Sequence, residues 1–398
     1  MEPCESAKMP SNKASALGGI VANSKMHREG RPTCVEVDLT RIRGNFMAVR
    51  AFLKKGVRIV AVVKGDAYGH GAVPVSRCLE KAGVDGLAVA ILEEALELRA
   101  AGIRLPILIL NGFWCGQEEQ LIRQELTPAV YHEKMVSRLS REARRLKIPA
   151  RYQVKIDTGM TRLGMPYEQA SEMIKRCLEK EWALCQGLYT HLSSAEEVGS
   201  PTNQLQIERF KSLLETLSVN HVQAACSHVV NSAGILNFRH AWFDAVRPGL
   251  ILYGINPLAN PAPLTVEPVL SFKTSVMQIK SVKAGTAVGY GGTYIVSKDS
   301  RVAILPVGYA DGLNRLISTR GCVLINGQRV PIAGRISMDL TAVEAGGQLQ
   351  VRQGDEVCLI GRQGDAEISV QEVAEWCSTI PYEVLCRIGK RVPRIYHD

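Results

Sequence analysis

Short apolar runs alternate with amphipathic stretches over most of the chain, from Thr33 to about residue 266. Runs rich in β-branched residues, such as the one at 57–63, are typical of strands buried in a parallel sheet, whereas apolar residues spaced three or four apart indicate helices. Strands are predicted at 57–64, 85–91, 106–111, 127–131, 152–157, 186–191, 222–228 and 243–247. Helices are predicted between them, including those at 92–101, 132–147 and 203–217.

The repeated succession of strand and helix indicates the fold class. Eight strands that are each followed by a helix suggest a (β/α)8 TIM-like barrel over residues 32–266. A doubly wound sheet is the alternative, because a sequence does not show whether the two edge strands pair with each other. We expect the barrel.

The pattern changes after residue 266. Short alternating runs at 270–279, 302–306, 321–325, 328–332 and 356–360 are separated by Gly, Asn-Gly and Gly-Asp turns, and only 370–377 has helical spacing. This pattern predicts a mostly β C-terminal domain over residues 267–398. Residues 1–31 are polar and irregular, which predicts a disordered or strap-like extension.

The amino-acid composition favours a soluble globular protein over a membrane or nucleic-acid-binding protein. With 46% hydrophobic and 22% charged residues, the 398-residue chain resembles a soluble globular protein, and its apolar runs are far shorter than the roughly 20 residues that cross a membrane. The net charge of +9 is scattered, without a basic stripe interleaved with aromatics, so we expect no nucleic-acid partner. Eleven cysteines without a Cys-x-x-Cys pair, and no apolar signal sequence, predict a cytoplasmic protein with neither disulfides nor a metal site.

Polar groups follow several of the predicted strands. The first strand ends in Lys64, and later ones lead into 155–164, 189–194, 227–233 and 246–250. Because the carboxyl ends of barrel strands meet at the mouth, these groups are expected to lie together. A lysine in a partly apolar mouth can lose its proton and condense with an aldehyde, while small residues after the last two strands can hold a phosphate. Each residue alone also has a structural explanation, such as a solvated lysine, but the set predicts a pyridoxal phosphate site.

Several motifs carry a resemblance to a known family. They include Lys64-Gly-Asp-Ala-Tyr-Gly-His and Val-Gly-Tyr290-Gly-Gly-Thr-Tyr. Together with them, the segments at 155–164, 191–195, 231–232, 247–254, 306–312, 334–339, 381–386 and 391–394 resemble alanine racemase of the type that joins a barrel to a β domain. The resemblance covers nearly everything from Thr33 to the end of the chain.

The resemblance implies two catalytic bases. Lys64 would bind pyridoxal 5'-phosphate and act on D-alanine, and Tyr290 of the partner subunit would act on L-alanine. Racemisation removes the α-proton from one face and delivers another to the opposite face, so two fixed bases serve both directions. An ordinary tyrosine has a pKa near 10, so Tyr290 needs neighbours such as His191, itself linked to Arg247. An arginine that faces the cofactor's ring nitrogen would also disfavour transamination.

The remaining site residues follow from the same resemblance. The expected cofactor contacts are Lys64, Tyr68, Arg162, His191, Asn231, Ser232, Arg247, Gly249 and Leu250, and the expected substrate contacts are Arg162, Met338, Asp339 and Tyr309. Lys155 stands at a position where the family can carry a carbamylated lysine. Ser337 replaces a common cysteine, and Lys390 stands where some members have a tyrosine that touches the phosphate, so that contact stays unassigned.

We therefore expect a homodimeric alanine racemase with shared active sites that interconverts L-alanine and D-alanine and supplies D-alanine for peptidoglycan. A racemase for serine or basic amino acids is one alternative, and a basic amino-acid decarboxylase of the same fold is another. A non-catalytic pyridoxal phosphate carrier is a third. Such carriers lack the β domain and therefore any counterpart of Tyr290.

Overall fold

The computed structural model describes residues 30–220, 225–258, 263–346 and 349–398. Within these ranges, everything from residue 32 onward belongs to one compact unit. Nearly all of the expected N-terminal extension, and residues 222–224 of the seventh predicted strand, lie outside the described residues.

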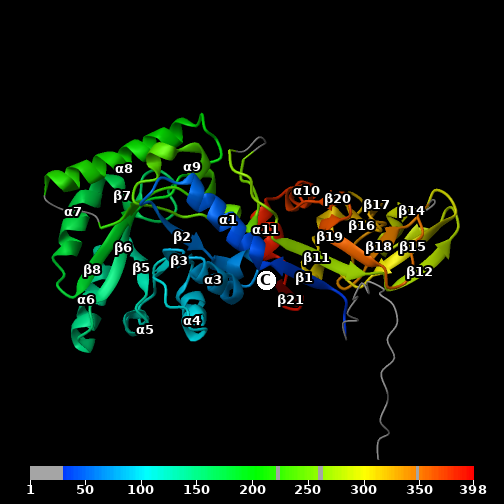
Figure 1. Cartoon of the computed structure of the whole chain (residues 1–398), viewed down its shortest axis with the longest axis horizontal. Coiled ribbons are helices and arrows are strands. Elements are labelled where there is room, and N and C mark those ends of the chain that lie inside the picture. Colours follow the sequence, from blue (N-terminus) through cyan, green and yellow to red (C-terminus); the bar gives the residue numbers. More distant parts are fainter. Residues whose placement is uncertain (1–29, 221–224, 259–262, 347–348) are drawn as a thin grey trace, which may run out of the picture. The chain divides into compact units, whose positions relative to one another are not determined.

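Eight parallel strands close into a barrel (Figure 1). In chain order they are β2 (Arg58–Val62), β3 (Gly86–Val89), β4 (Ile107–Ile109), β5 (Thr127–Val130), β6 (Ala150–Asp157), β8 (Ala183–Tyr189), β9 (Ser227–His228) and β10 (Ala245–Val246). Each pairs with the next, and β10 pairs with β2 to close the ring. The predicted barrel is confirmed, and the doubly wound alternative is wrong.

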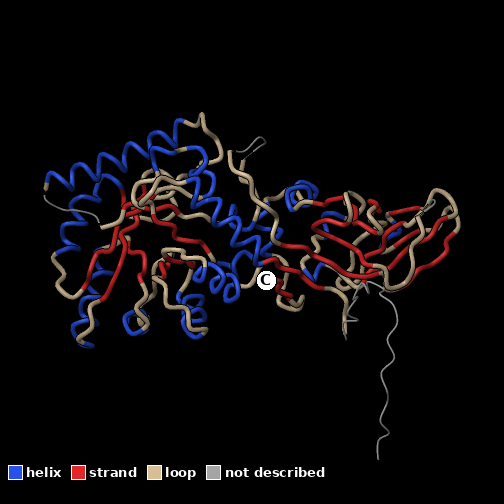
Figure 2. Tube along the Cα trace, in the orientation of Figure 1, coloured by secondary structure: helices blue, strands red, loops and turns tan. Residues whose placement is uncertain are grey.

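Helices lie outside the barrel strands (Figure 2). They are α3 (Ala72–Lys81), α4 (Leu92–Ala100), α5 (Glu118–Arg123), α6 (Glu133–Leu146), α7 (Tyr167–Leu178), α8 (Pro201–Val219) and α9 (Ser232–Asn237), with short turns α2 (Lys64–Tyr68), η1 (Arg239–Ala241) and η2 (Leu250–Tyr253) and a small strand β7 (Met165–Pro166). The helices predicted at 92–101, 132–147 and 203–217 are confirmed as α4, α6 and α8. Helix α8 begins at Pro201, because proline suits the first helical position.

The C-terminal part is mostly β, as predicted. Its strands are β11 (Leu270–Ser275), β12 (Gln278–Val282), β13 (Ala287–Val288), β14 (Tyr294–Ile295), β15 (Ser300–Leu305), β16 (Cys322–Ile325), β17 (Gln328–Pro331), β18 (Thr341–Glu344), β19 (Glu356–Gln363), β20 (Ala366–Ile368) and β21 (Arg394–His397). Its helical segments are η3 (Tyr290–Gly292), η4 (Tyr309–Asp311), η5 (Arg315–Ile317), α10 (Val370–Trp376) and α11 (Pro381–Cys386).

The single run expected at 270–279 is wrong, because the chain changes sheets in the middle of it. The N–H of Val276 donates to the carbonyl of Asp355 at 2.9 Å, whereas the N–H of Met277 donates to that of Ile304 at 2.8 Å. Strand β11 therefore pairs with β19, and β12 pairs with β15.

The first elements of the compact unit were not predicted. Strand β1 (Cys34–Asp38) pairs antiparallel with β11 and parallel with β21, so both ends of the unit share one sheet of the C-terminal part. Helix α1 (Leu39–Phe52) follows, and the Asp38 side chain caps it by accepting from the N–H of Arg41. The domain limits 32–266 and 267–398 stay a prediction. Strand β1 lies within the first range in the sequence but pairs with strands of the second.

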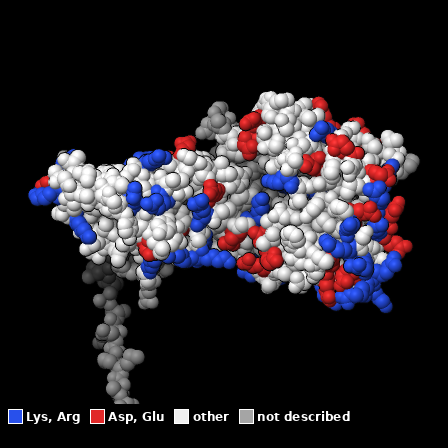
Figure 3. All heavy atoms as spheres, turned by 180° about the vertical axis from the view of Figure 1, so that it is seen from behind, with Lys and Arg blue, Asp and Glu red and all other residues white. Residues whose placement is uncertain are grey.

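Basic and acidic side chains both occur across the face shown in Figure 3, separated by uncharged surface. Among the described residues, no helix is both long and apolar enough to cross a membrane.

Candidate active site

Lys64 follows β2 at the mouth of the barrel, at the start of a strained turn. Gly65, Asp66, Ala67 and Tyr68 all have positive φ, between 52° and 61°. Three of these four residues are not glycine, so the conformation is costly and has to be held by its surroundings. Glu94 accepts a hydrogen bond from the N–H of Gly65 at 2.7 Å, and Asp66 accepts one from that of Ala72 at 2.7 Å.

Helix α11 and strand β21 of the C-terminal part hold the same turn from outside the barrel. A Cβ on Gly69 would lie 2.5 Å from the carbonyl oxygen of Leu385, so only glycine fits there. Arg394 Nε donates to the carbonyl of Gly69 at 3.1 Å. The C-terminal part thus fixes the position of Lys64 in its own chain.

Arg247 is buried at the end of β10 and donates to four acceptors. Its Nη2 donates to the carbonyls of Thr190 at 2.7 Å and Val229 at 2.8 Å and to Nδ1 of His191 at 3.3 Å, while Nη1 donates to Nδ1 of His228. A guanidinium only donates, so both histidines accept through Nδ1 and carry their proton on Nε2. Among the described residues, no acceptor pairs with Nε of Arg247, which leaves this donor available to a ligand.

Positive groups crowd the mouth. Burial, and then the Arg162 guanidinium, lower the pKa of Lys64. Burial, followed by Arg162 and Arg247, lowers the pKa of Lys155 to about 8. Burial and Arg247 likewise hold the pKa of His191 well below its usual range. Neither lysine forms an ion pair with a carboxylate in the described part of the chain, so the mouth is suited to an anionic ligand.

Substitution of Lys155 tests whether the crowded positive charges at the mouth destabilise the folded protein. The folded pKa of Lys155, about 8, lies below the ordinary lysine pKa of 10.5. The charge therefore destabilises the folded state fully below pH 8, and stability recovers as the pH rises from 8 towards 10.5. We expect Lys155→Met to stabilise the cofactor-free protein at pH 7 by up to about 3 kcal/mol, at about 1.4 kcal/mol per pKa unit, with the gain fading towards pH 10. Thermal unfolding in buffer free of carbon dioxide measures the difference. The exposed Lys54→Met is the control, and an equal gain at both pH values would contradict the prediction.

Small groups form a cradle between the last two strands of the barrel. The Ser232 hydroxyl accepts from the N–H of Gly249 at 2.9 Å, and a Cβ on Gly249 would lie 2.5 Å from the hydroxyl oxygen of Tyr68. Asn231 begins α9 by accepting from the N–H of Gly234, and Leu250 begins η2. The site residues Tyr68, Asn231, Ser232, Gly249 and Leu250 therefore meet in one place.

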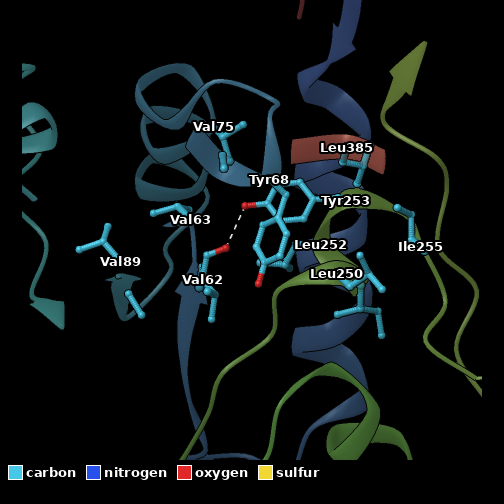
Figure 4. Packing of buried hydrophobic residues seen from close by; sticks show 14 of the residues in the cluster. Val62, Val63, Tyr68, Val75, Val89, Leu250, Leu252, Tyr253, Ile255 and Leu385 are labelled. Carbon is cyan, nitrogen blue, oxygen red and sulfur yellow. Dashed lines mark hydrogen bonds between the residues drawn. The ribbon is translucent and has the colours of Figure 1, made fainter. Parts of the chain in front are cut away.

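Aromatic packing holds Tyr68 in this cradle. Its ring lies 4.9 Å from that of Tyr253 and 5.5 Å from that of Tyr382, measured between centroids. The Tyr253 hydroxyl in turn donates to the carbonyl of Val62 on β2 at 2.9 Å (Figure 4). The strand that leads to Lys64 is thereby tied to the residues of the cradle.

Arg162 lies on an exposed loop that β6 shapes. One carboxylate oxygen of Asp157 accepts from the N–H groups of Gly159, Met160 and Thr161, each at 3.0 Å. These three bonds form a turn directly after β6. Arg162 consequently acts electrostatically on Lys64 and on Lys155.

The expected residues of the β domain form a separate group. Tyr309 donates its N–H to the carbonyl of Ser337, beside Met338, and Asp339 pairs with Arg391 at 2.6 Å. Tyr290, on the β13–β14 hairpin, is 68% exposed. Within the described residues of one chain, no hydrogen bond or ion pair joins Tyr290, Tyr309, Met338 or Asp339 to the barrel mouth.

Comparison with known proteins identifies the family. Residues 37–257 match the family model of the alanine racemase N-terminal domain, and residues 269–396 match that of the C-terminal domain. The chain belongs to the alanine racemase family. An alanine racemase of Carboxydothermus hydrogenoformans is 42% identical, with 92% of this chain and 100% of that protein covered. One of Syntrophobacter fumaroxidans is 40% identical, with coverage of 92% and 97%.

Solved structures of alanine racemases are also similar to this chain. Alanine racemase from Bacillus anthracis with bound L-Ala-P has a TM-score of 0.86 at 37% identity, over 93% of this chain and 96% of that one. Alanine racemase from Bartonella henselae, with covalently bound pyridoxal phosphate, has a TM-score of 0.83 at 30% identity, over 92% and 100%. The expected enzyme class, an amino-acid racemase, is confirmed, and the decarboxylase and carrier alternatives are not supported.

Two residues inside the barrel of this alanine racemase family member were not assigned a role from the sequence. His228 ends β9, and its ring stacks on that of Tyr189 at 4.9 Å. Gln153 of β6 lies behind it, with Oε1 at 2.8 Å from Nε2 of His228. The motif at 227–233 placed His228 at a strand end, but only the contact with Arg247 shows what it does.

Proposed function

We propose that the protein is a pyridoxal phosphate-dependent alanine racemase that interconverts L-alanine and D-alanine by two-base proton transfer. The observation that carries this proposal is Lys64 at the end of β2, with its pKa lowered and with cationic groups and a small-residue cradle around it. Such a lysine is suited to condense with an aldehyde that carries a phosphate.

The residues present fit that cofactor. Tyr68, Asn231, Ser232, Gly249 and Leu250 would hold the phosphate, and the free Nε donor of Arg247 would face the ring nitrogen. His191 and Arg162 would lie beside the ring. When bound, the cofactor supplies an aldehyde for amines and an acceptor for the electrons that the α-carbon gains when its proton leaves.

Lys64 and Arg247 have distinct tasks in the reaction. The lowered pKa of Lys64 increases its neutral fraction, so its amine can take the α-proton of D-alanine. Arg247 would donate to the ring nitrogen of a bound cofactor and disfavour its protonation, because two adjacent positive charges repel. In this role Arg247 would favour racemisation over transamination.

Tyr290 is the base for L-alanine in this proposal, and the partner subunit provides it. Its phenol is exposed, and no hydrogen bond or ion pair among the described residues joins it to the mouth of its own barrel, so a second copy of the chain would bring it to the opposite face. His191 accepts from Arg247 through Nδ1 and therefore offers its Nε2–H to the incoming phenol. A donated hydrogen bond stabilises the phenolate and lowers the pKa of a tyrosine. Tyr309, Met338 and Asp339 would contact the substrate from the same partner surface.

Lys155 is proposed as the site of carbamylation. It is buried, and a pKa of about 8 makes about a tenth of it neutral amine at pH 7, far more than in an ordinary lysine. A neutral amine adds to carbon dioxide to give a carbamate and releases one proton. The resulting negative charge would pair with Arg162 and position it for the substrate carboxylate.

In the cell, we infer that the enzyme supplies D-alanine for peptidoglycan and works in the cytoplasm. Nine cysteines of the described ranges, from Cys78 to Cys386, are free thiols, which suits a reducing compartment. A role with serine or basic amino acids remains the second candidate for the substrate.

An enantiomer-conversion assay tests the function. Purified protein, stripped of cofactor and then reloaded with pyridoxal phosphate, is incubated with L-alanine, L-serine, L-lysine and L-arginine in turn, and chiral chromatography measures the D-enantiomer. We expect conversion only after reloading, with the highest kcat/KM for alanine. Faster conversion of serine or a basic amino acid would overturn the substrate, and no conversion of any would overturn the function.

A further inference from the structure

We propose that Gln153 is a positioning residue, which fixes the proton of His228 on Nε2 and thereby keeps the other ring nitrogen free to hold Arg247. Its last step, the effect on the cofactor's ring nitrogen, rests on the proposed function. Gln153 lies on β6 within the barrel, and its side chain forms no hydrogen bond, in the described part of the chain, with the mouth residues that would hold cofactor or substrate.

The hydrogen-bond chain has one consistent direction. Arg247 can only donate, so Nδ1 of His228 accepts from it. The neutral ring must then carry its proton on Nε2, and Oε1 of Gln153 accepts that proton's hydrogen bond at 2.8 Å. An amide oxygen placed here makes this tautomer the favoured one, because the other tautomer would leave two lone pairs facing each other.

The surroundings of His228 keep it neutral. It is fully buried, with the Tyr189 ring stacked on it from β8, the guanidiniums of Arg247 and of Arg58 on β2 acting on it, and the Cys226 thiol two residues earlier in the chain, just before β9. Burial, Arg247 and Arg58 all lower the pKa of His228. No carboxylate contacts the ring among the described residues, and Gln153 adds no charge.

A carboxylate in place of the Gln153 amide would change the protonation state of His228. It would stabilise the doubly protonated ring, whose Nδ1–H would then point at an N–H of Arg247. Two donors cannot share a hydrogen bond, so Arg247 would lose one of its four acceptors. An apolar side chain would instead leave Nε2–H without a partner and free the ring to adopt either tautomer.

A cavity at the base of the barrel has room for substituted side chains at position 153, and its wall also includes a residue suited to a matched control, Gln186. A cavity of about 370 Å³ opens there among the first residues of the strands, and Gln153, Gln186, Arg58 and Cys226 contribute to its wall. Gln186 is on the adjacent strand β8, and the described residues show no hydrogen bond between it and His228. A carboxylate at 186 therefore adds the same charge to the same cavity without contact with the ring.

The first test uses cofactor-free protein labelled with ¹⁵N-histidine, in which nitrogen chemical shifts separate protonated from bare ring nitrogens. The His228 signal is identified by its loss in His228→Asn. In the unmodified protein and in Gln186→Glu we expect only the Nε2–H tautomer from about pH 6 to about pH 9. In Gln153→Glu we expect both nitrogens protonated at about pH 7, and in Gln153→Met a mixture of tautomers. A single Nε2–H tautomer in both Gln153 variants would overturn the proposal.

The second test uses the loaded enzyme and its side reaction. Transamination passes the amino group of alanine to the cofactor and releases pyruvate, which lactate dehydrogenase detects. We expect pyruvate formed per racemisation event to rise about tenfold in Gln153→Glu, less in Gln153→Met, and to stay within about twofold in Gln186→Glu. If the amount of pyruvate per racemisation event is unchanged in both Gln153 variants, the proposed effect of Gln153 on Arg247 is overturned. Absence of racemisation in the unmodified protein would overturn the proposed function, while the labelled-histidine experiment still decides the role of Gln153.

Discussion

Lys64→Ala is expected to lower racemisation more than about 10⁴-fold, because the variant loses both the covalent anchor of the cofactor and one of the two bases. The absorbance that the bound cofactor shows near the visible edge is expected to disappear after gel filtration. Borohydride treatment followed by mass spectrometry should label the peptide with residue 64 in the unmodified protein and give no labelled lysine in the variant.

Lys55→Ala is the matched control. Lys55 is exposed and lies before the same strand, so its loss changes the net charge equally without touching the mouth. We expect this control to keep its activity, its absorbance and the label on Lys64. Labelling of another lysine, or an unchanged spectrum in Lys64→Ala, would refute the assignment of the cofactor lysine.

The barrel could be predicted because each strand carries its own signal. A run such as 57–63 is apolar on both faces, which occurs where a parallel sheet is covered on both sides, and the turn after it is rich in glycine. Strand β1 has no such local signal: its five residues pair with β11 and β21, both more than two hundred residues away. Long-range pairing of a short strand is set by the whole fold, so the sequence analysis missed it.

In the candidate site, too, the contacts between distant parts of the chain could not be predicted from local sequence patterns. Lys64 was placed correctly at a strand end, but the positive φ angles of the turn after it arise from contacts with Glu94 and with α11, which no local pattern encodes. Likewise, Arg247 was expected at the ring nitrogen, yet its four acceptors come from different barrel strands and loops. The sequence analysis named residues that are expected to touch a ligand and left out His228, which contacts Arg247, and Gln153, which contacts His228.

Tyr290→Phe is expected to slow racemisation by about 10²- to 10⁴-fold, the usual contribution of a positioned acid or base, while the cofactor stays bound with its absorbance unchanged. The equilibrium constant between enantiomers is one, so both directions slow together. Exchange of the α-hydrogen with deuterated water separates the two faces. In Tyr290→Phe, D-alanine should still exchange through Lys64, whereas L-alanine should not. Tyr167→Phe keeps its ring over Arg209 and is the control for loss of a phenol elsewhere.

A mixing experiment decides whether Tyr290 acts across subunits. Lys64→Ala and Tyr290→Phe are each nearly inactive, but a mixed dimer with shared sites holds one site with both defects and one with none. Random exchange of subunits makes about half of the dimers mixed, so an equal mixture should recover about a quarter of the unmodified activity. If both bases came from the same chain, every site in the mixture would keep one defect, and the activity would stay at the level of the parents. That second result would overturn the shared site, because the exposed phenol of Tyr290 would then have to reach Lys64 within its own subunit.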